Sequence, residues 1–182
     1  RESLRNYEKY RPLIISCLIN YGEFLRFKTG ERTPMSDAAL QEWGEFCATV
    51  ARDSLGFTNK FEIWNEFDIL WGAMNWDGVG PEGYVKILKT AYEAIKKVDP
   101  TAEVISFSLA GANIDYLYTK YIEEGFAYGA ANYCDAVSIH PYYWSGPPKQ
   151  GKVYEVIAKC FRDLMDRYGM EGKPLYVTEV GW

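Results

Sequence analysis

Five short apolar runs are spaced along the sequence, and segments with a helical pattern separate them. The runs are rich in Ile, Val, Leu, Phe and Tyr and are mostly continuous rather than alternating, which is typical of parallel strands covered on both faces. The predicted strands are Leu13–Ile19, Phe61–Trp64, Val104–Phe107, Ala136–Ile139 and Leu175–Thr178. No hairpin signal joins one run to the next, so an α/β fold with a parallel sheet is expected.

The segments between the runs carry helix start and stop signals. Ser36 can cap a helix, and Pro81 suits the first turn of the next one. The predicted helices run from Ser36 to near Gly56, from Pro81 to Pro100, from Asp115 to Glu124 and from Val153 to Gly169, after the tail of an earlier helix at residues 1–10. Repeated βα units fit either an open doubly wound sheet or a (β/α)8 barrel. No G-x-G-x-x-G follows the first run, which weakens the dinucleotide-binding form of the open sheet.

Composition narrows the class of protein. The 182 residues are 48% hydrophobic and 25% charged, as in an ordinary globular domain. The net charge is −5 and the basic residues are scattered, which argues against a nucleic-acid partner. No apolar run approaches the ~20 residues of a membrane span. The four cysteines stand far apart without a C-x-x-C pair and are predicted to be small buried hydrophobes, with disulfides as the alternative that their spacing does not place.

Polar and aromatic residues follow four of the predicted strands. The strand-end sequences are Asn20-Tyr21-Gly22, Trp64-Asn65-Glu66, His140-Pro141-Tyr142 and Thr178-Glu179-Val180-Gly181-Trp182. A carboxylate at the end of a buried strand costs desolvation unless it has partners, and barrel enzymes carry their chemistry at this end of the sheet. Glu66 and Glu179 are therefore expected to face one mouth.

Two facing carboxyl groups suit the cleavage of a glycosidic bond. One carboxyl protonates the leaving oxygen, and the other attacks the anomeric carbon or activates a water. Asn65 is expected to hydrogen-bond a sugar hydroxyl, and Tyr142 or another phenol to hold the free oxygen of the nucleophile. His140, the single histidine, is interpreted as a hydrogen-bonding partner of the substrate or of the carboxylates.

These motifs, in this order, resemble the large clan of retaining (β/α)8 glycosidases that includes cellulases, mannanases and β-xylosidases. The resemblance implies that Glu66 is the general acid/base at the end of strand four and that Glu179 is the nucleophile at the end of strand seven. Residues 1–182 would then be the central part of a single (β/α)8 catalytic domain, an incomplete barrel of about five βα units that lacks strands one, two and eight. It implies no cofactor.

The resemblance also bears on substrate and location. The expected reaction is hydrolysis of a β-linked glycan or glycoside with retention, and the expected partner is an oligosaccharide or polysaccharide. A secreted or periplasmic location is favoured from this substrate class alone. Trp144 and Trp182 fall in or beside the predicted mouth loops, where flat rings can stack on sugars. The predicted substrate-binding set is Asn65, His140, Tyr142, Trp144 and Trp182.

Other chemistries lack the residues they need. A metal-dependent barrel hydrolase requires several histidines, and the sequence has one. A serine hydrolase of the G-x-S-x-G type lacks its motif. Lys60 and Lys173 precede their strands, so neither is placed for Schiff-base chemistry. A non-catalytic carbohydrate-binding barrel remains the alternative to an enzyme.

Overall fold

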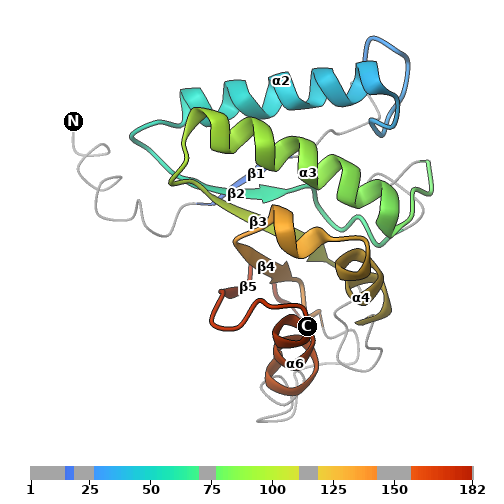
Figure 1. Ribbon diagram of the computed structural model, residues 1–182, viewed down its shortest axis with the longest axis vertical. Coiled ribbons are helices and arrows are strands. Elements are labelled where there is room, and N and C mark those ends of the chain that lie inside the picture. The colour runs from blue at the N-terminus through green and yellow to red at the C-terminus, as the bar shows by residue number, and fades with distance from the viewer. Residues whose placement is uncertain (1–14, 19–26, 70–76, 111–118, 143–156, 182) are drawn as a thin grey trace.

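One parallel sheet organises the chain. The computed structural model describes residues 15–18, 27–69, 77–110, 119–142 and 157–181, without the side chains of residues 157 and 158. The strands are β1 (Ser16–Leu18), β2 (Lys60–Ile63), β3 (Glu103–Leu109), β4 (Ala136–Ile139) and β5 (Leu175–Val177). Each strand pairs in parallel with the next, so the order in the sheet is β1-β2-β3-β4-β5 (Figure 1).

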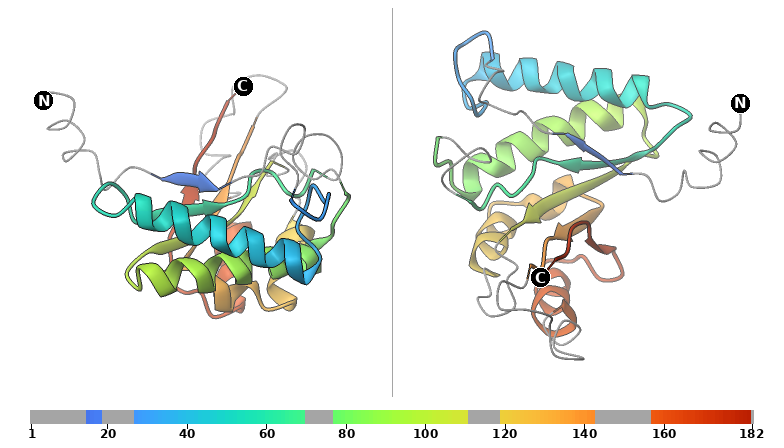
Figure 2. Two further views of the ribbon diagram at one scale, coloured as in Figure 1. Left: turned by 90° about the horizontal axis from the view of Figure 1, so that it is seen from above. Right: turned by 180° about the vertical axis from the view of Figure 1, so that it is seen from behind.

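The strand order decides between the two architectures that the sequence left open. A doubly wound sheet reverses its strand order at a switch point, whereas the strands of a barrel follow one another in sequence. The described sheet is sequential from end to end, and α2 (Asp37–Asp53) and α3 (Pro81–Val98) pack together on one face of it (Figure 2). The arrangement is that of a section of a (β/α)8 barrel.

The two long helices begin where local chemistry favours a start. Ser36 caps α2, and its Oγ accepts a hydrogen bond of 3.3 Å from the backbone N–H of Ala39. Pro81 is the first residue of α3, where its missing N–H is not needed. The remaining helical segments are α4 (Thr119–Ala127), a 3-10 turn at Ala130–Tyr133, a π-helical turn at Ile157–Arg162 and α6 (Asp163–Arg167). The predicted helix at residues 1–10 and the start of the one at Asp115 lie outside the described residues.

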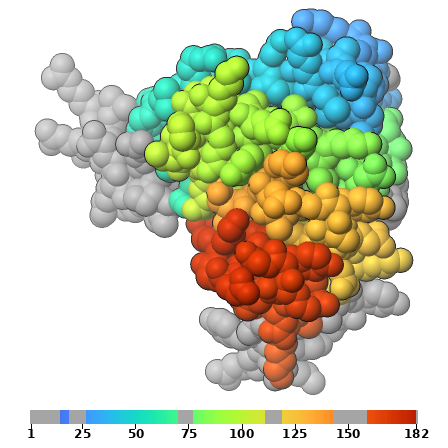
Figure 3. All heavy atoms as spheres, viewed as in Figure 1, coloured from blue at the N-terminus to red at the C-terminus, as the bar shows by residue number. Residues whose placement is uncertain are grey.

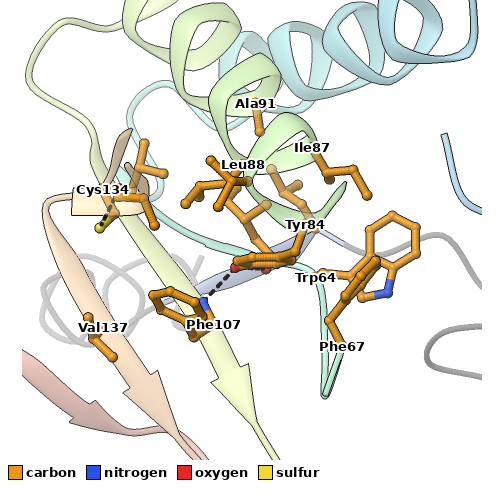
Figure 4. Packing of buried hydrophobic residues seen from close by; sticks show 14 of the residues in the cluster. Trp64, Phe67, Tyr84, Ile87, Leu88, Ala91, Phe107, Cys134 and Val137 are labelled. Atoms are coloured by element: carbon orange, nitrogen blue, oxygen red, sulfur yellow. Dashed lines mark hydrogen bonds between the residues drawn. The ribbon is translucent and has the colours of Figure 1, made fainter. Parts of the chain in front are cut away.

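A continuous row of aromatic rings forms the core between the helices and the sheet. Neighbouring ring centroids lie 5.2 to 5.5 Å apart along the row (Figure 4). The rings in order are those of Trp43, Trp64, Phe67, Tyr84, Phe107 and Phe126. Each of these side chains is at most 3% exposed, so the row fixes the ends of β2 and β3 against α3.

The cysteines follow the sequence prediction only in part. Cys47 and Cys134 are buried and unpaired, as expected of small hydrophobes. The prediction is wrong for Cys17, which is exposed on β1. None of the helices in the described ranges has the length and apolar character that a membrane span requires.

Candidate active site

The backbone that carries Glu66 adopts an unusual conformation. Trp64 and Glu66 directly follow β2 and have φ angles of 70° and 49°. Non-glycine residues rarely occupy this left-handed region, and such strain clusters at functional sites. Two neighbouring strands hold it in place: the N–H of Trp64 donates to Leu18 O on β1, and the N–H of Glu66 donates to Ser108 O on β3, each at 2.8 Å.

A buried phenol braces the same region from the helical side. Tyr84 on α3 donates a hydrogen bond of 3.1 Å to Ile63 O and accepts one of 2.6 Å from the N–H of Phe107 (Figure 4). Phe107 has a φ of 80°, so the phenol also supports a strained residue on β3. Burial raises the pKa of Tyr84 well above its usual value, so the hydroxyl remains a donor.

His140 lies at the centre of the site, directly after β4. Its side chain is 0% exposed, and its Nδ1 lies 3.0 Å from Glu66 Oε1. Its Nε2 lies 3.1 Å from Ser108 Oγ and 3.0 Å from Thr178 Oγ1. Of the two roles predicted for this residue, the contacts favour the hydrogen bond to a carboxylate. A direct contact with substrate is not supported, because the ring is buried and both nitrogens have side-chain partners.

Glu179 follows β5, and Tyr142 binds its carboxylate. The phenol Oη donates a hydrogen bond of 2.7 Å to Glu179 Oε2, the contact that the sequence predicted for a phenol beside the nucleophile. This bond, burial and the negative charge of Glu179 together raise the pKa of Tyr142 to about 12. Gly181 permits the arrangement: a Cβ at this position would lie 2.9 Å from the Tyr142 ring.

The two carboxyl groups meet at the same edge of the sheet. One oxygen of Glu66, one of Glu179 and a nitrogen of His140 all lie within 4.8 Å of one another. Glu66 is 15% exposed in its side chain and Glu179 is 44% exposed, so the second carboxyl is the more open to solvent. Carboxylates with an imidazole can in principle bind a cation, but both ring nitrogens of His140 are already hydrogen-bonded here.

Sequence reasoning missed three polar residues beneath this edge: Glu62, Ser108 and Thr178. Glu62 lies within β2, is 5% exposed, and accepts a hydrogen bond of 2.8 Å from Thr178 Oγ1. A signal for it was present, because a carboxylate inside a continuous apolar run needs a partner when buried. Ser108 carried no such signal, since serine is unremarkable in a strand.

The other predicted residues are placed only in part. Asn65 is half-buried between Trp64 and Glu66 at the end of β2. Trp144 and Trp182 lie outside the described residues, so the predicted stacking surface remains a prediction. A separate groove lies between α2 and α3 on the outer face of the molecule, and Figure 3 shows this face with α2 in blue to cyan and α3 in green. None of the residues that line the groove belongs to the candidate site.

Comparison with known proteins places the fold. No protein-family model matches the chain, and no curated protein matches it. Among solved structures, it is similar to a glucosidase from Croceicoccus marinus, with 18% identity and a TM-score of 0.63 over 78% of this chain and 30% of that one. It is similar to a GH39 β-xylosidase from Caulobacter crescentus, with 22% identity and a TM-score of 0.58 over 78% of this chain and 30% of that one.

The likeness extends to a third solved structure and confirms the expected fold. The GH53 catalytic domain of Ignisphaera aggregans matches 100% of this chain and 50% of its own length, with 20% identity and a TM-score of 0.56. The chain thus spans 30% to 50% of the length of these structures. At this identity the likeness concerns the fold, which is a section of the TIM barrel found in these glycoside hydrolases.

Proposed function

We propose that the chain forms part of the catalytic domain of a glycoside hydrolase that cleaves β-linked glycans or glycosides with retention. The observation that carries the proposal is the meeting of Glu66 and Glu179 at the carboxyl edge of one parallel sheet, with oxygens within 4.8 Å. Carboxyl groups about 5–5.5 Å apart serve a double displacement, whereas inverting enzymes need about 6.5–9.5 Å to admit a water. The short separation supports retention.

The contacts around each carboxyl suit different roles. Glu179 is the more exposed, and the Tyr142 hydrogen bond holds one of its oxygens while leaving the other to attack the anomeric carbon. Glu66 protonates the leaving oxygen in the first step and removes a proton from the incoming water in the second. Asn65, beside Glu66, hydrogen-bonds a sugar hydroxyl, and Trp144 and Trp182 stack on the sugar rings.

The domain boundaries are part of the proposal. Residues 1–182 form the central part of a single (β/α)8 domain, with β1 to β5 as strands three to seven. That the chain covers only 30% to 50% of the solved structures is consistent with part of a longer domain. The proposed substrate is an oligosaccharide or polysaccharide, and this substrate class alone favours a secreted or periplasmic location.

Substitution of the two carboxyl groups in the protein that carries this sequence tests the proposal. Glu66→Gln and Glu179→Gln should each lower kcat on alkyl β-glucosides or β-xylosides, whose leaving groups are poor, by at least about 100-fold. Glu171→Gln, at an exposed turn, is the matched control and should leave kcat unchanged. Turnover near that of the wild type in either active-site variant would contradict the assignment.

Product stereochemistry tests the mechanism. Proton NMR of the first-formed product should show the anomer of the substrate, and a 2-deoxy-2-fluoro glycoside should label Glu179 covalently. An inverted product would instead make Glu179 a general base. Binding of glycans without turnover of any glycoside would favour the carbohydrate-binding barrel.

A further inference from the structure

A chain of hydrogen bonds links a second buried carboxyl to Glu66. Glu62 Oε1 lies 2.8 Å from Thr178 Oγ1, and Thr178 Oγ1 lies 3.0 Å from His140 Nε2. The opposite nitrogen of the same ring, Nδ1, lies 3.0 Å from Glu66 Oε1. The carboxyl group of Glu62 on β2 is therefore joined to that of Glu66, which follows β2, through side chains that follow β5 and β4.

The number of protons available to these hydrogen bonds restricts which group donates and which accepts in each. An ionised carboxylate only accepts, and a threonine hydroxyl has one proton to donate. Thr178 gives that proton to Glu62, so its oxygen can only accept from His140. The contact at 3.0 Å therefore requires a proton on Nε2, which Ser108 Oγ at 3.1 Å can share. In a neutral ring, Nδ1 then has a lone pair and must accept from its partner.

We propose that Glu62, acting through Thr178 and His140, keeps the proton of the general acid on Glu66. Glu62 is a positioning residue, because it orients the hydrogen bonds of His140 and does not contact the substrate. The proposal rests on the role of Glu66 given above and adds the groups that prepare it. Without this device a neutral histidine beside a carboxylate would carry its proton on Nδ1 and leave Glu66 ionised.

The negative charge of Glu179 also favours a proton on Glu66. An oxygen of Glu179 lies within 4.8 Å of Glu66, and its Oε2 lies 3.9 Å from His140 Nδ1. Two ionised carboxylates at this distance repel each other. While Glu179 is the ionised nucleophile, a proton on Glu66 therefore relieves the repulsion, and the Nδ1 lone pair provides that proton with an acceptor.

The ring of His140 reports the proposal directly and without substrate. In the protein that carries this sequence, the ring nitrogens of His140 can be assigned in the 15N spectrum of histidine-labelled protein as the signals that His140→Gln removes. Near neutral pH we expect a protonated Nε2 and an unprotonated Nδ1. A proton on Nδ1, in a neutral or a charged ring, would overturn the proposal whatever the activity.

Thr178 offers a matched pair of variants for the same measurement. Thr178→Val removes the hydroxyl that joins Glu62 to the ring, and we expect the ring proton to move to Nδ1. Thr178→Ser keeps the hydroxyl and should keep the wild-type tautomer. Glu62→Leu removes the carboxyl group at the other end of this series of hydrogen bonds and should behave like Thr178→Val. The second variant keeps the test available if one of the two fails to fold. An unchanged tautomer in a folded Thr178→Val or Glu62→Leu protein would overturn the proposal.

Kinetics separate the positioning role from a general loss of structure. Acid catalysis matters most when the leaving group is poor, so Thr178→Val should lower kcat on alkyl glycosides by about 10-fold or more. This loss is part of the roughly 10²–10⁴-fold rate increase that general acid–base catalysis typically contributes. Activated aryl glycosides should lose much less, and Thr178→Ser should restore both. Equal losses on both substrates would overturn the role in acid catalysis. Wild-type protein inactive on every glycoside would defeat the proposed function but leave the tautomer result standing.

Discussion

At the scale of single residues, the phenol of Tyr142 is the group most directly attached to a reacting carboxyl. Its 2.7 Å hydrogen bond ends on Glu179 Oε2. Hydrogen bonds to charged groups contribute about 1.5–3 kcal/mol, so Tyr142→Phe should lower kcat by roughly 10- to 100-fold. Steady-state kinetics would measure this loss, with Tyr128→Phe, an exposed residue outside the site, as the control. An unchanged kcat would show that the Tyr142 hydroxyl does not contribute to catalysis.

The titration of Tyr142 gives a second prediction. Its pKa is raised from an ordinary 10 to about 12, because the protonated phenol donates to Glu179. The contribution of this bond is therefore complete below about pH 10 and declines as the pH rises toward 12. Any loss of activity on the alkaline side below pH 10 must come from other groups. We therefore expect the activity of Tyr142→Phe to fall with pH below pH 10 at the same pKa as that of the wild type. A shift of this alkaline pKa in the variant would contradict the prediction.

At the scale of elements, α3 stabilises the strand ends through one hydroxyl. Tyr84→Phe leaves the N–H of Phe107 and the carbonyl of Ile63 without their buried partner. Unsatisfied buried groups cost about 1–3 kcal/mol, so the free energy of unfolding should fall by about that amount. Urea denaturation measures the change. Tyr92→Phe, on the same helix and partly buried, is the control and should change the stability little.

The elements were largely predictable because each carries its own local signal. The predicted strand Ala136–Ile139 has its observed bounds, and Ser36 and Pro81 start their helices as expected. The end of β3 was less predictable: the strand continues to Leu109, and its pairing register shifts between Ser106 and Leu109. An irregularity of this kind depends on neighbouring strands, which a single run of residues does not encode.

The candidate site was predictable in its carboxyl groups but not in their supports. Glu66 and Glu179 stand out because each ends an apolar run. The direction of the His140 ring and the bond from Thr178 to Glu62 depend on how three strands are aligned. That alignment is a property of the folded sheet, and the sequence left His140 with two roles because nothing local distinguishes them.

At the scale of the molecule, the described sheet ends in two unpaired strands. β1 and β5 are its edges, and five strands are too few to close an eight-stranded barrel. Near one edge Val177 and Val180 are 43% and 56% exposed. We expect the 182-residue chain on its own to be inactive and to associate, as light scattering during gel filtration would show. Val180→Lys should reduce the association, and a monomeric chain with a sharp melting transition would contradict the prediction.

The left-handed backbone at Glu66 has a conformational free-energy cost that the contacts of its side chain must offset. A side chain at a φ of 49° costs about 1 kcal/mol or more that glycine would not incur. Glu66→Gly would remove this cost, but it would also leave the buried Nδ1 of His140 without its carboxyl partner, which costs about 1–3 kcal/mol. We therefore expect a protein that melts no higher than the wild type and no longer turns over glycosides. Directed evolution that rewards heat resistance alone should then retain this glutamate, because the hydrogen bond to His140 offsets the cost of its backbone.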